Sequence, residues 1–186
     1  MRLFLIRHGS TAGNLEKRYI GRTDQPLCEE GIAEIRRISL PECQRIICSP
    51  MKRCVQTAEI LFPGQIPFIY SGLRECDFGE FEGKNYTELS GNEAYQRWID
   101  SGGTLPFPCG ESPDDFRKRC ADTFLDAVGD CAGISSAAMV VHGGTIMSVL
   151  ERYAFPHRDY YDWLCGNGCG WVSNWDGEKL TETEKL

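Results

Sequence analysis

The stretch LFLIRHGSTAGN, Leu3–Asn14, places four apolar residues directly before an arginine, a histidine and a glycine. A short continuous apolar run is typical of a strand that is buried on both faces of a parallel sheet. Ligands of open α/β sheets bind beyond the carboxyl ends of the strands, so polar residues that follow such a strand are well placed for chemistry. We therefore expect Leu3–Arg7 to be a central strand that delivers Arg7 and His8 to a site.

A second stretch, AAMVVHGG, has the same order of an apolar run, a histidine and glycine, and it ends in His142, Gly143 and Gly144. If both strands are central and parallel, His8 and His142 meet at one edge of the sheet and face one cleft. A lone histidine after a strand is more often structural, but these are two of only three histidines in the chain. The glycines permit tight turns and let backbone N–H groups approach an anion.

Apolar runs alternate with segments of helical period along the chain, which predicts an α/β fold with a mostly parallel central sheet and helices on both faces. Further strands are expected at Arg45–Cys48, Phe68–Tyr70 and Ala138–His142. Helices are expected at Glu30–Leu40, Lys52–Leu61, Asn92–Ser101, Pro113–Val128 and Thr145–Phe155. The terminal stretch GWVSNWDGEKLTETEKL predicts an antiparallel hairpin at the sheet edge, because Asp-Gly between alternating residues is a hairpin signal.

The composition indicates one domain over residues 1–186, with 41% hydrophobic residues and a formal net charge of −7. An acidic chain is poorly suited to nucleic acid or to an anionic membrane surface, so neither is expected as a partner. No apolar run approaches the roughly 20 residues that cross a bilayer, and MRLFLIRHG is too short for a secretory signal. We therefore expect a cytoplasmic protein; no pattern in the sequence specifies its oligomeric state.

The ten cysteines contain no CxxC pair, and only Cys165 and Cys169 lie close together in the sequence. Free thiols that act as small hydrophobic side chains are favoured over a disulfide framework or a zinc site. We expect no metal and no cofactor.

Two further stretches supply charged side chains. In RIICSPMKRCVQTAEI, Arg53 falls in the first turn of a helix, where the helix dipole disfavours a cation; a bound anion would explain it, and a solvated surface arginine is the alternative. In LRECDFGEFEGK, Glu75 lies among apolar residues that could raise its carboxyl pKa and make it a proton donor. Glu80 and Glu82 compete for that role, and a solvated surface position is favoured for any one of these acidic residues.

Together these stretches resemble the histidine phosphatase superfamily, also called the phosphoglycerate mutase-like family. The resemblance is carried, in order, by LIRHGSTAGN, GRTDQPLCEEG, SPMKRCVQTA, LRECDFGEFEG and VVHGG. It implies that His8 is the nucleophile that becomes phosphohistidine, in metal-independent chemistry on a small phosphomonoester. It implies a phosphate pocket formed by Arg7, Asn14, Arg53, His142 and Gly143.

The same resemblance makes Glu75 the proton donor and places Gly21 in a loop that borders the substrate. Ser10 stands where many relatives have Glu or Gln, so we place it in the substrate pocket without assigning it a role. The family contains phosphatases and mutases; mutases typically carry Glu-Arg-x-Tyr-Gly where this chain has ECDFG, which favours a phosphatase.

Several stretches, among them PFPCGESPDDFRKR, are similar to α-ribazole phosphatases of cobalamin biosynthesis, although GES before PDDF is equally an ordinary helix start. A phosphoglycerate mutase, a broad-specificity sugar-phosphate or nucleotide phosphatase and a non-catalytic phosphate-binding protein are the alternatives. Some aromatic residues could wall a pocket for a flat heterocycle, although such residues more often pack in a core or on a surface. They are Tyr95, Trp98, Tyr160, Tyr161 and Trp163.

Overall fold

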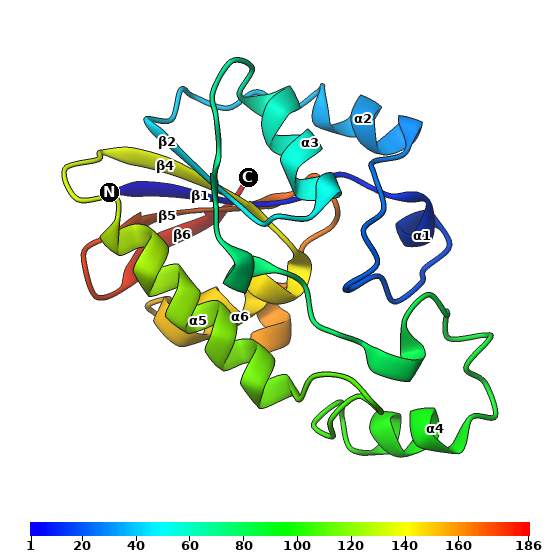
Figure 1. Ribbon diagram of the computed structural model, residues 1–186. Helices are drawn as coiled ribbons and strands as arrows, with labels where there is room; N and C mark the ends of the chain where they lie inside the picture. Colours follow the sequence, from blue (N-terminus) through cyan, green and yellow to red (C-terminus); the bar gives the residue numbers. More distant parts are fainter.

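A six-stranded sheet forms the middle of the molecule, with its strands in the order β3-β2-β4-β1-β5-β6 (Figure 1). The computed structural model describes all of residues 1–186. Strands β1 to β4 are parallel, whereas β5 is antiparallel to β1 and to β6. The strands are β1 (Arg2–Arg7), β2 (Arg45–Cys48), β3 (Phe68–Ile69), β4 (Ser136–Val141), β5 (Gly170–Trp175) and β6 (Leu180–Lys185). The mostly parallel sheet and the C-terminal antiparallel edge hairpin are confirmed.

The apolar run of β1 is continuous because both faces of this central strand are covered. Leu3 and Leu5 belong to one hydrophobic cluster, and Phe4 and Ile6 belong to a second cluster on the other face. Successive side chains of a strand point to opposite faces, so a strand between two helical layers needs apolar residues at every position.

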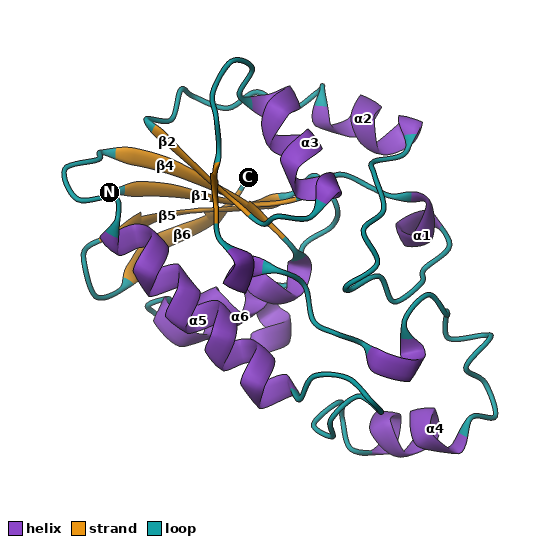
Figure 2. Cartoon of the chain, in the orientation of Figure 1, coloured by secondary structure: helices purple, strands orange, loops and turns teal.

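Helices cover both faces of the sheet, as expected (Figures 1 and 2). One layer holds α2 (Glu29–Ile35) and α3 (Lys52–Leu61), and the other holds α5 (Pro113–Gly129) and α6 (Gly143–Tyr153). The short α1 (Ala12–Leu15) and α4 (Glu93–Asp100) lie beyond the carboxyl ends of the parallel strands. Three 3₁₀ turns complete the fold, η1 (Ser71–Leu73), η2 (Gly79–Phe81) and η3 (Tyr160–Trp163).

The helix that the sequence predicts at Glu30–Leu40 is shorter in the structure, where α2 ends at Ile35. The following amides of Arg37 and Ile38 bond three residues back, in a 3₁₀ arrangement that does not continue as an α-helix. Pro41 also disfavours a helical conformation at the residue before it, which limits how far the helix can extend.

The predicted strand and helix around His142 also shift slightly. Strand β4 ends at Val141, His142 has an extended backbone with φ −114° and ψ 164°, and α6 begins at Gly143 rather than at Thr145. His142 therefore occupies the residue position immediately before the helix. The turn between β4 and α6 is as short as possible, and it places the start of α6 at the edge of the sheet.

A smaller hydrophobic cluster lies outside the two main layers and includes Phe81, Leu89, Phe107 and Phe116. It joins the segment around α4 to the first turn of α5, so it forms a wall beside the carboxyl ends of the parallel strands. All ten cysteines are free thiols, and seven of them are buried. None of the helices combines the length and the apolar character that a membrane span requires.

Candidate active site

The two histidines that follow β1 and β4 lie side by side at the carboxyl edge of the sheet. Their ring centroids are 5.2 Å apart, with the ring planes inclined at 68°. The side-by-side arrangement follows from the register, because Arg7 pairs with Val141 and the next amide, that of His8, donates to the Val141 carbonyl at 3.0 Å. The expectation that His8 and His142 share one edge of the sheet is confirmed.

The contacts of His8 determine which ring nitrogen carries the proton. Its Nδ1 lies 2.7 Å from the carbonyl oxygen of Gly9, which can only accept, so Nδ1 carries the hydrogen. Nε2 then has a lone pair, and it accepts from Nε of Arg53 at 3.2 Å. Burial, followed by the charges of Arg53 and Arg7, lowers the pKa of His8 well below its ordinary value. His8 is therefore a neutral imidazole whose Nε2 carries the free lone pair.

Arg53 is fully buried, which excludes the surface-arginine alternative. Its guanidinium donates to the backbone carbonyls of Thr23 at 3.0 Å, Gly21 at 2.9 Å and Ile20 at 3.4 Å. It forms none of the ion pairs that the structure contains. A buried cation without a carboxylate partner is costly, so this position is well suited to an anionic ligand.

Arg7 supplies a second cation beside the histidines. Its Nη1 donates to the carbonyl oxygen of Cys165 at 2.7 Å, whereas its buried Nε has no hydrogen-bond partner. The guanidinium packs against Gly143, where an added Cβ would lie 3.3 Å from Arg7 Nε and Cζ. An unpaired buried donor of this kind is expected to bond a ligand.

His142 lies on the other side of the site and is also neutral. Its Nε2 is 2.8 Å from the hydroxyl of Ser49, and burial followed by the charge of Arg53 lowers the pKa of His142 well below its ordinary value. His142, the residue before α6, provides no side-chain cap, so the amide hydrogen of Gly143 is free to meet an anion, whereas that of Gly144 donates to Glu75.

Glu75 reaches the site from the loop after η1. Its two carboxylate oxygens accept from the backbone amides of Cys76 at 3.0 Å and Gly144 at 3.4 Å. Burial raises the pKa of Glu75, although Arg53 and Arg7 act in the opposite direction. Its carboxyl group is thus more easily protonated than an ordinary glutamate. Among the three candidate acidic residues of this segment, Glu75 is the one that contacts the start of α6.

The structure separates Glu75 from its two sequence competitors. Glu80 is exposed, and its carboxylate contacts only the thiol of Cys109. Glu82 faces the loop that holds Arg53, and its Oε1 accepts from the backbone amides of Gly21 and Thr23, both at 2.9 Å. Neither is a pocket-lining residue of the cavity beside Glu75.

Asn14 is half-buried close to the backbone of His8. Its Oδ1 accepts from the amide of Thr11 at 3.1 Å and from Nδ2 of Asn167 at 3.3 Å, while its own Nδ2 makes no hydrogen bond within the protein. Asn167 also donates to the carbonyl oxygen of His8 at 3.1 Å. Sequence reasoning missed Asn167, because a single asparagine in a loop near the C-terminus carries no recognisable signal.

Ser10 and Gly21 contact other parts of the protein and do not face the cavity that the sequence led us to expect them to border. The buried hydroxyl of Ser10 donates to Glu34 of α2 at 3.0 Å, on the side of the chain that faces that helix. Gly21 is packed so closely that an added Cβ would lie 1.9 Å from the carbonyl oxygen of Cys76. Neither residue lines the cavity beside Glu75.

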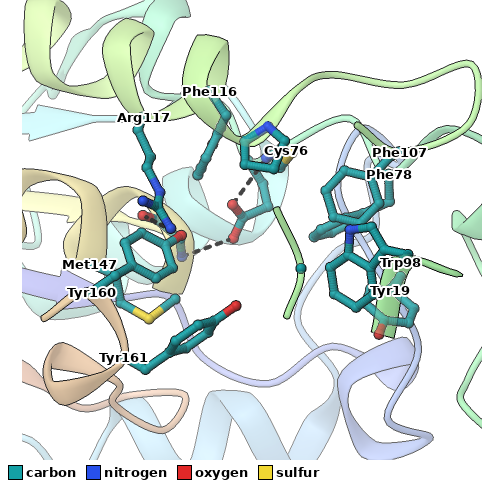
Figure 3. A pocket seen from close by; sticks show the side chains of 14 residues that line it. Tyr19, Cys76, Phe78, Trp98, Phe107, Phe116, Arg117, Met147, Tyr160 and Tyr161 are labelled. Atoms are coloured by element: carbon teal, nitrogen blue, oxygen red, sulfur yellow. Dashed lines mark hydrogen bonds between the residues drawn. The ribbon is translucent and has the colours of Figure 1, made fainter. Parts of the chain in front are cut away.

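A cavity of about 230 Å³ opens beside Glu75 and is lined mostly by apolar side chains (Figure 3). Met147, Tyr160 and Tyr161 lie on one side of it, and Tyr19, Phe78, Trp98 and Phe107 lie on the other. Arg117 is its only cationic lining residue and packs 4.1 Å from the centre of the Tyr160 ring.

Only some of the aromatic residues that the sequence suggested as pocket walls line the cavity. Trp98, Tyr160 and Tyr161 line the cavity. Trp163 is a core residue with 1% exposure, and Tyr95 packs on Phe81 with ring centroids 5.3 Å apart. The other lining aromatics come from three separate segments, so their proximity could not be read from sequence spacing.

Two arginines, two neutral histidines and a carboxyl group of raised pKa thus converge at the carboxyl edge of an α/β sheet. The arrangement is suited to an anionic ligand, and it places an unprotonated imidazole nitrogen and a carboxyl group of raised pKa at one site. The family model of the histidine phosphatase superfamily (branch 1) matches residues 3–184. The chain belongs to this superfamily, and it is an enzyme of a family whose named members include phosphatases and mutases.

Several known proteins are similar to the chain over most of its length. The adenosylcobalamin/α-ribazole phosphatase of Salmonella typhimurium is 28% identical over 180 residues, which cover 91% of this chain and 88% of that protein. A broad-specificity phosphatase of Saccharomyces cerevisiae is 30% identical over 172 residues, 85% of this chain and 72% of that protein.

Solved structures share the fold. The crystal structure of phosphoglycerate mutase from Thermus thermophilus has a TM-score of 0.74 at 31% identity and covers 100% of this chain and 99% of that chain. The α-ribazole phosphatase from Shigella flexneri has a TM-score of 0.84, covering 97% of this chain and 94% of that chain. Its identity is only 22%, so this second likeness concerns the fold alone.

Proposed function

We propose that the protein is a metal-independent phosphomonoesterase that works through a phosphohistidine on Nε2 of His8. The observation that carries the proposal is the state of His8, which is buried and neutral and has its Nδ1 hydrogen engaged by the Gly9 carbonyl. Nε2 is then the only ring nitrogen with a lone pair to attack phosphorus. When substrate binds, Arg53 donates to a phosphoryl oxygen instead of to Nε2.

The phosphoryl group is held by the donors that surround His8. Charge in phosphoryl transfer is spread over the equatorial oxygens, which suits several fixed cations and N–H groups. Arg53 and the unpaired Nε of Arg7 supply charge, and the free amide of Asn14 supplies a neutral donor. His142 and the amide hydrogen of Gly143 complete the set.

Glu75 serves as acid and then as base. In the first step the bond between Nε2 of His8 and phosphorus forms, the ester P–O bond breaks, and the protonated Glu75 gives its proton to the leaving alcohol oxygen. In the second step Glu75 takes a proton from water, the water oxygen bonds to phosphorus, and the P–N bond breaks. Inorganic phosphate leaves and the initial protonation state returns.

The cavity beside Glu75 favours a substrate whose alcohol part contains a flat aromatic ring, such as α-ribazole 5′-phosphate. Phenolic, indole and phenyl rings form its walls, and such rings stack on planar heterocycles. A phosphoglycerate mutase would have to bind a carboxylate here, and only Arg117 among the lining residues is cationic. Hydrolysis by a phosphatase with broad specificity is the second candidate, because a relative of that name is 30% identical.

Hydrolysis of p-nitrophenyl phosphate in the presence of EDTA tests the chemistry. We expect turnover by the wild-type protein, loss of turnover in His8→Ala and full turnover in His157→Ala. His157 is a suitable control because it is the third histidine of the chain and is exposed. Activity of His8→Ala at the wild-type level would exclude His8 as nucleophile, and an inactive wild-type protein that binds phosphate would indicate the non-catalytic alternative.

A comparison of kcat/KM across substrates tests the finer assignment. The set is α-ribazole 5′-phosphate, 3-phosphoglycerate, sugar phosphates and nucleotides. We expect the highest value for α-ribazole 5′-phosphate, with inorganic phosphate as product. Similar values for all of them would favour the broad-specificity phosphatase, and transfer of the phosphoryl group to a second alcohol would favour the mutase.

A further inference from the structure

The buried guanidinium of Arg53 is held by a loop rather than by a carboxylate. The backbone carbonyls of Gly21 and Thr23 accept from its Nη2 and Nη1 at 2.9 Å and 3.0 Å. These contacts aim Arg53 Nε at Nε2 of His8, 3.2 Å away. The geometry of the nucleophile therefore depends on what holds residues 20–23 in place.

Glu82 holds this loop from its opposite side. Its Oε1 accepts from the amides of Gly21 and Thr23, both at 2.9 Å, so these two residues direct their N–H groups to Glu82 and their carbonyls to Arg53. The peptide unit between Ile20 and Gly21 lies directly between the two charges, because its oxygen is 3.4 Å from Arg53 Nη2. A peptide dipole that is bonded at both ends is polarised and held more firmly than one bonded at a single end.

Gly21 packs closely against the segment that carries Glu82. A Cβ on Gly21 would lie 1.9 Å from the carbonyl oxygen of Cys76 and 2.9 Å from the Phe78 ring. The same Cβ would lie 3.0 Å from Oε2 of Glu82, a buried oxygen without a hydrogen-bond partner. The segment that carries Glu82 is thus in direct contact with the loop, and its carboxylate is the side-chain acceptor for both loop amides.

We propose that Glu82 is a positioning residue of the active site, which holds Arg53 against His8 through the backbone of residues 20–23. Its importance for turnover rests on the proposed function, whereas its effect on Arg53 and His8 does not. Glu82 itself lies outside the cavity beside Glu75, so it acts through the loop and does not touch the substrate.

Three variants test this role. Glu82→Ala removes the acceptor, and we expect kcat/KM for p-nitrophenyl phosphate to fall by about 100-fold, the effect of misplacing a catalytic group by roughly 1 Å. Glu82→Gln keeps an oxygen at Oε1, and this variant is expected to retain most of the activity that Glu82→Ala loses. Glu80→Ala is the matched control, because Glu80 is an exposed carboxylate two residues away, and it is expected to behave as wild type.

A second measurement separates positioning from a loss of folding. The charged and titratable groups around His8 are Arg53, Arg7, His142 and Glu75. Burial lowers the pKa of His8 most, and the charge of Arg53 lowers it more than that of Arg7. In Glu82→Ala the displaced Arg53 should lower the pKa of His8 less, so we expect the His8 resonances in NMR to titrate at higher pH than in wild type. The melting temperature of every variant is recorded as the control for folding. If Glu82→Ala proves too unstable, Glu82→Gln is measured at the same resonances, with a smaller shift expected.

The outcomes are distinguishable. Wild-type activity in Glu82→Ala, or lost activity with a lower melting temperature and unchanged His8 titration, would overturn the positioning role. A shifted His8 titration would support it even if the wild-type protein hydrolysed no phosphomonoester, a result that would refute only the proposed function.

Discussion

Replacing Glu75 by glutamine tests the proposed proton transfer most directly. The amide has nearly the same shape and keeps an oxygen that can accept from the Cys76 amide, now bonded at 3.0 Å, but it has no proton of suitable acidity. A positioned general acid contributes about 10²–10⁴-fold to such reactions. We expect release of an alkyl alcohol to slow by that factor in Glu75→Gln. Release of p-nitrophenolate should slow little, because this anion leaves without a proton.

The assay measures alcohol release before the steady state. With p-nitrophenyl phosphate, Glu75→Gln is expected to release about one equivalent of product rapidly and then turn over slowly, because attack by water on the phosphohistidine still lacks its base. An alkyl phosphate should give no such burst. Equal slowing of the first turnover for both esters would refute the role of Glu75 as acid.

The substitution Glu75→Gln should also change the free energy of unfolding in a pH-dependent way. Burial raises the folded-state pKa of Glu75 above its ordinary value of 4.5, so the unfolded chain loses this proton at lower pH than the folded protein does. The ionised carboxylate therefore disfavours folding as pH rises through the folded pKa. Glu75→Gln should melt at a higher temperature than wild type at pH 7, and the difference should vanish below about pH 4. A lower melting temperature at pH 7 would contradict this account of its surroundings.

Two further predictions concern the histidines and the cavity. Burial lowers the folded-state pKa of His8 and His142 below 6.5, the pKa that they have in the unfolded chain. The free energy of unfolding is therefore retained above pH 6.5 and falls as the pH decreases below that value. Each contributes up to about 1.4 kcal/mol per pH unit, so denaturant titrations of His142→Gln should show a shallower decline than wild type. Tyr161→Ala should raise KM for an aromatic alcohol phosphate roughly 2- to 10-fold, from a stacking energy of about 0.5–1.5 kcal/mol. Its KM for a small alkyl phosphate should stay unchanged; equal increases for both would argue against stacking.

Local sequence patterns were enough to predict the main elements and the edge of the sheet at which the site lies. The apolar runs before His8 and His142 indicate central strands, since only a strand covered on both faces needs apolar side chains at every position. Parallel neighbours end at one edge, so the side-by-side histidines followed from that assignment. Lys52–Leu61 and Pro113–Val128 were predicted almost to their ends, because helical period and a serine cap are local signals.

Packing between distant segments establishes which charged residues are buried and what surrounds each of them. Without the family resemblance, local residue patterns could not distinguish a buried Arg53 from a solvated one or choose among Glu75, Glu80 and Glu82, because burial depends on segments far apart in the chain. Ser10 shows the same limit, since its hydroxyl donates to Glu34 of α2, 24 residues later in the chain. The aromatic cavity likewise draws its walls from separate segments, and the chemistry of each side chain depends on that packing as much as on its identity.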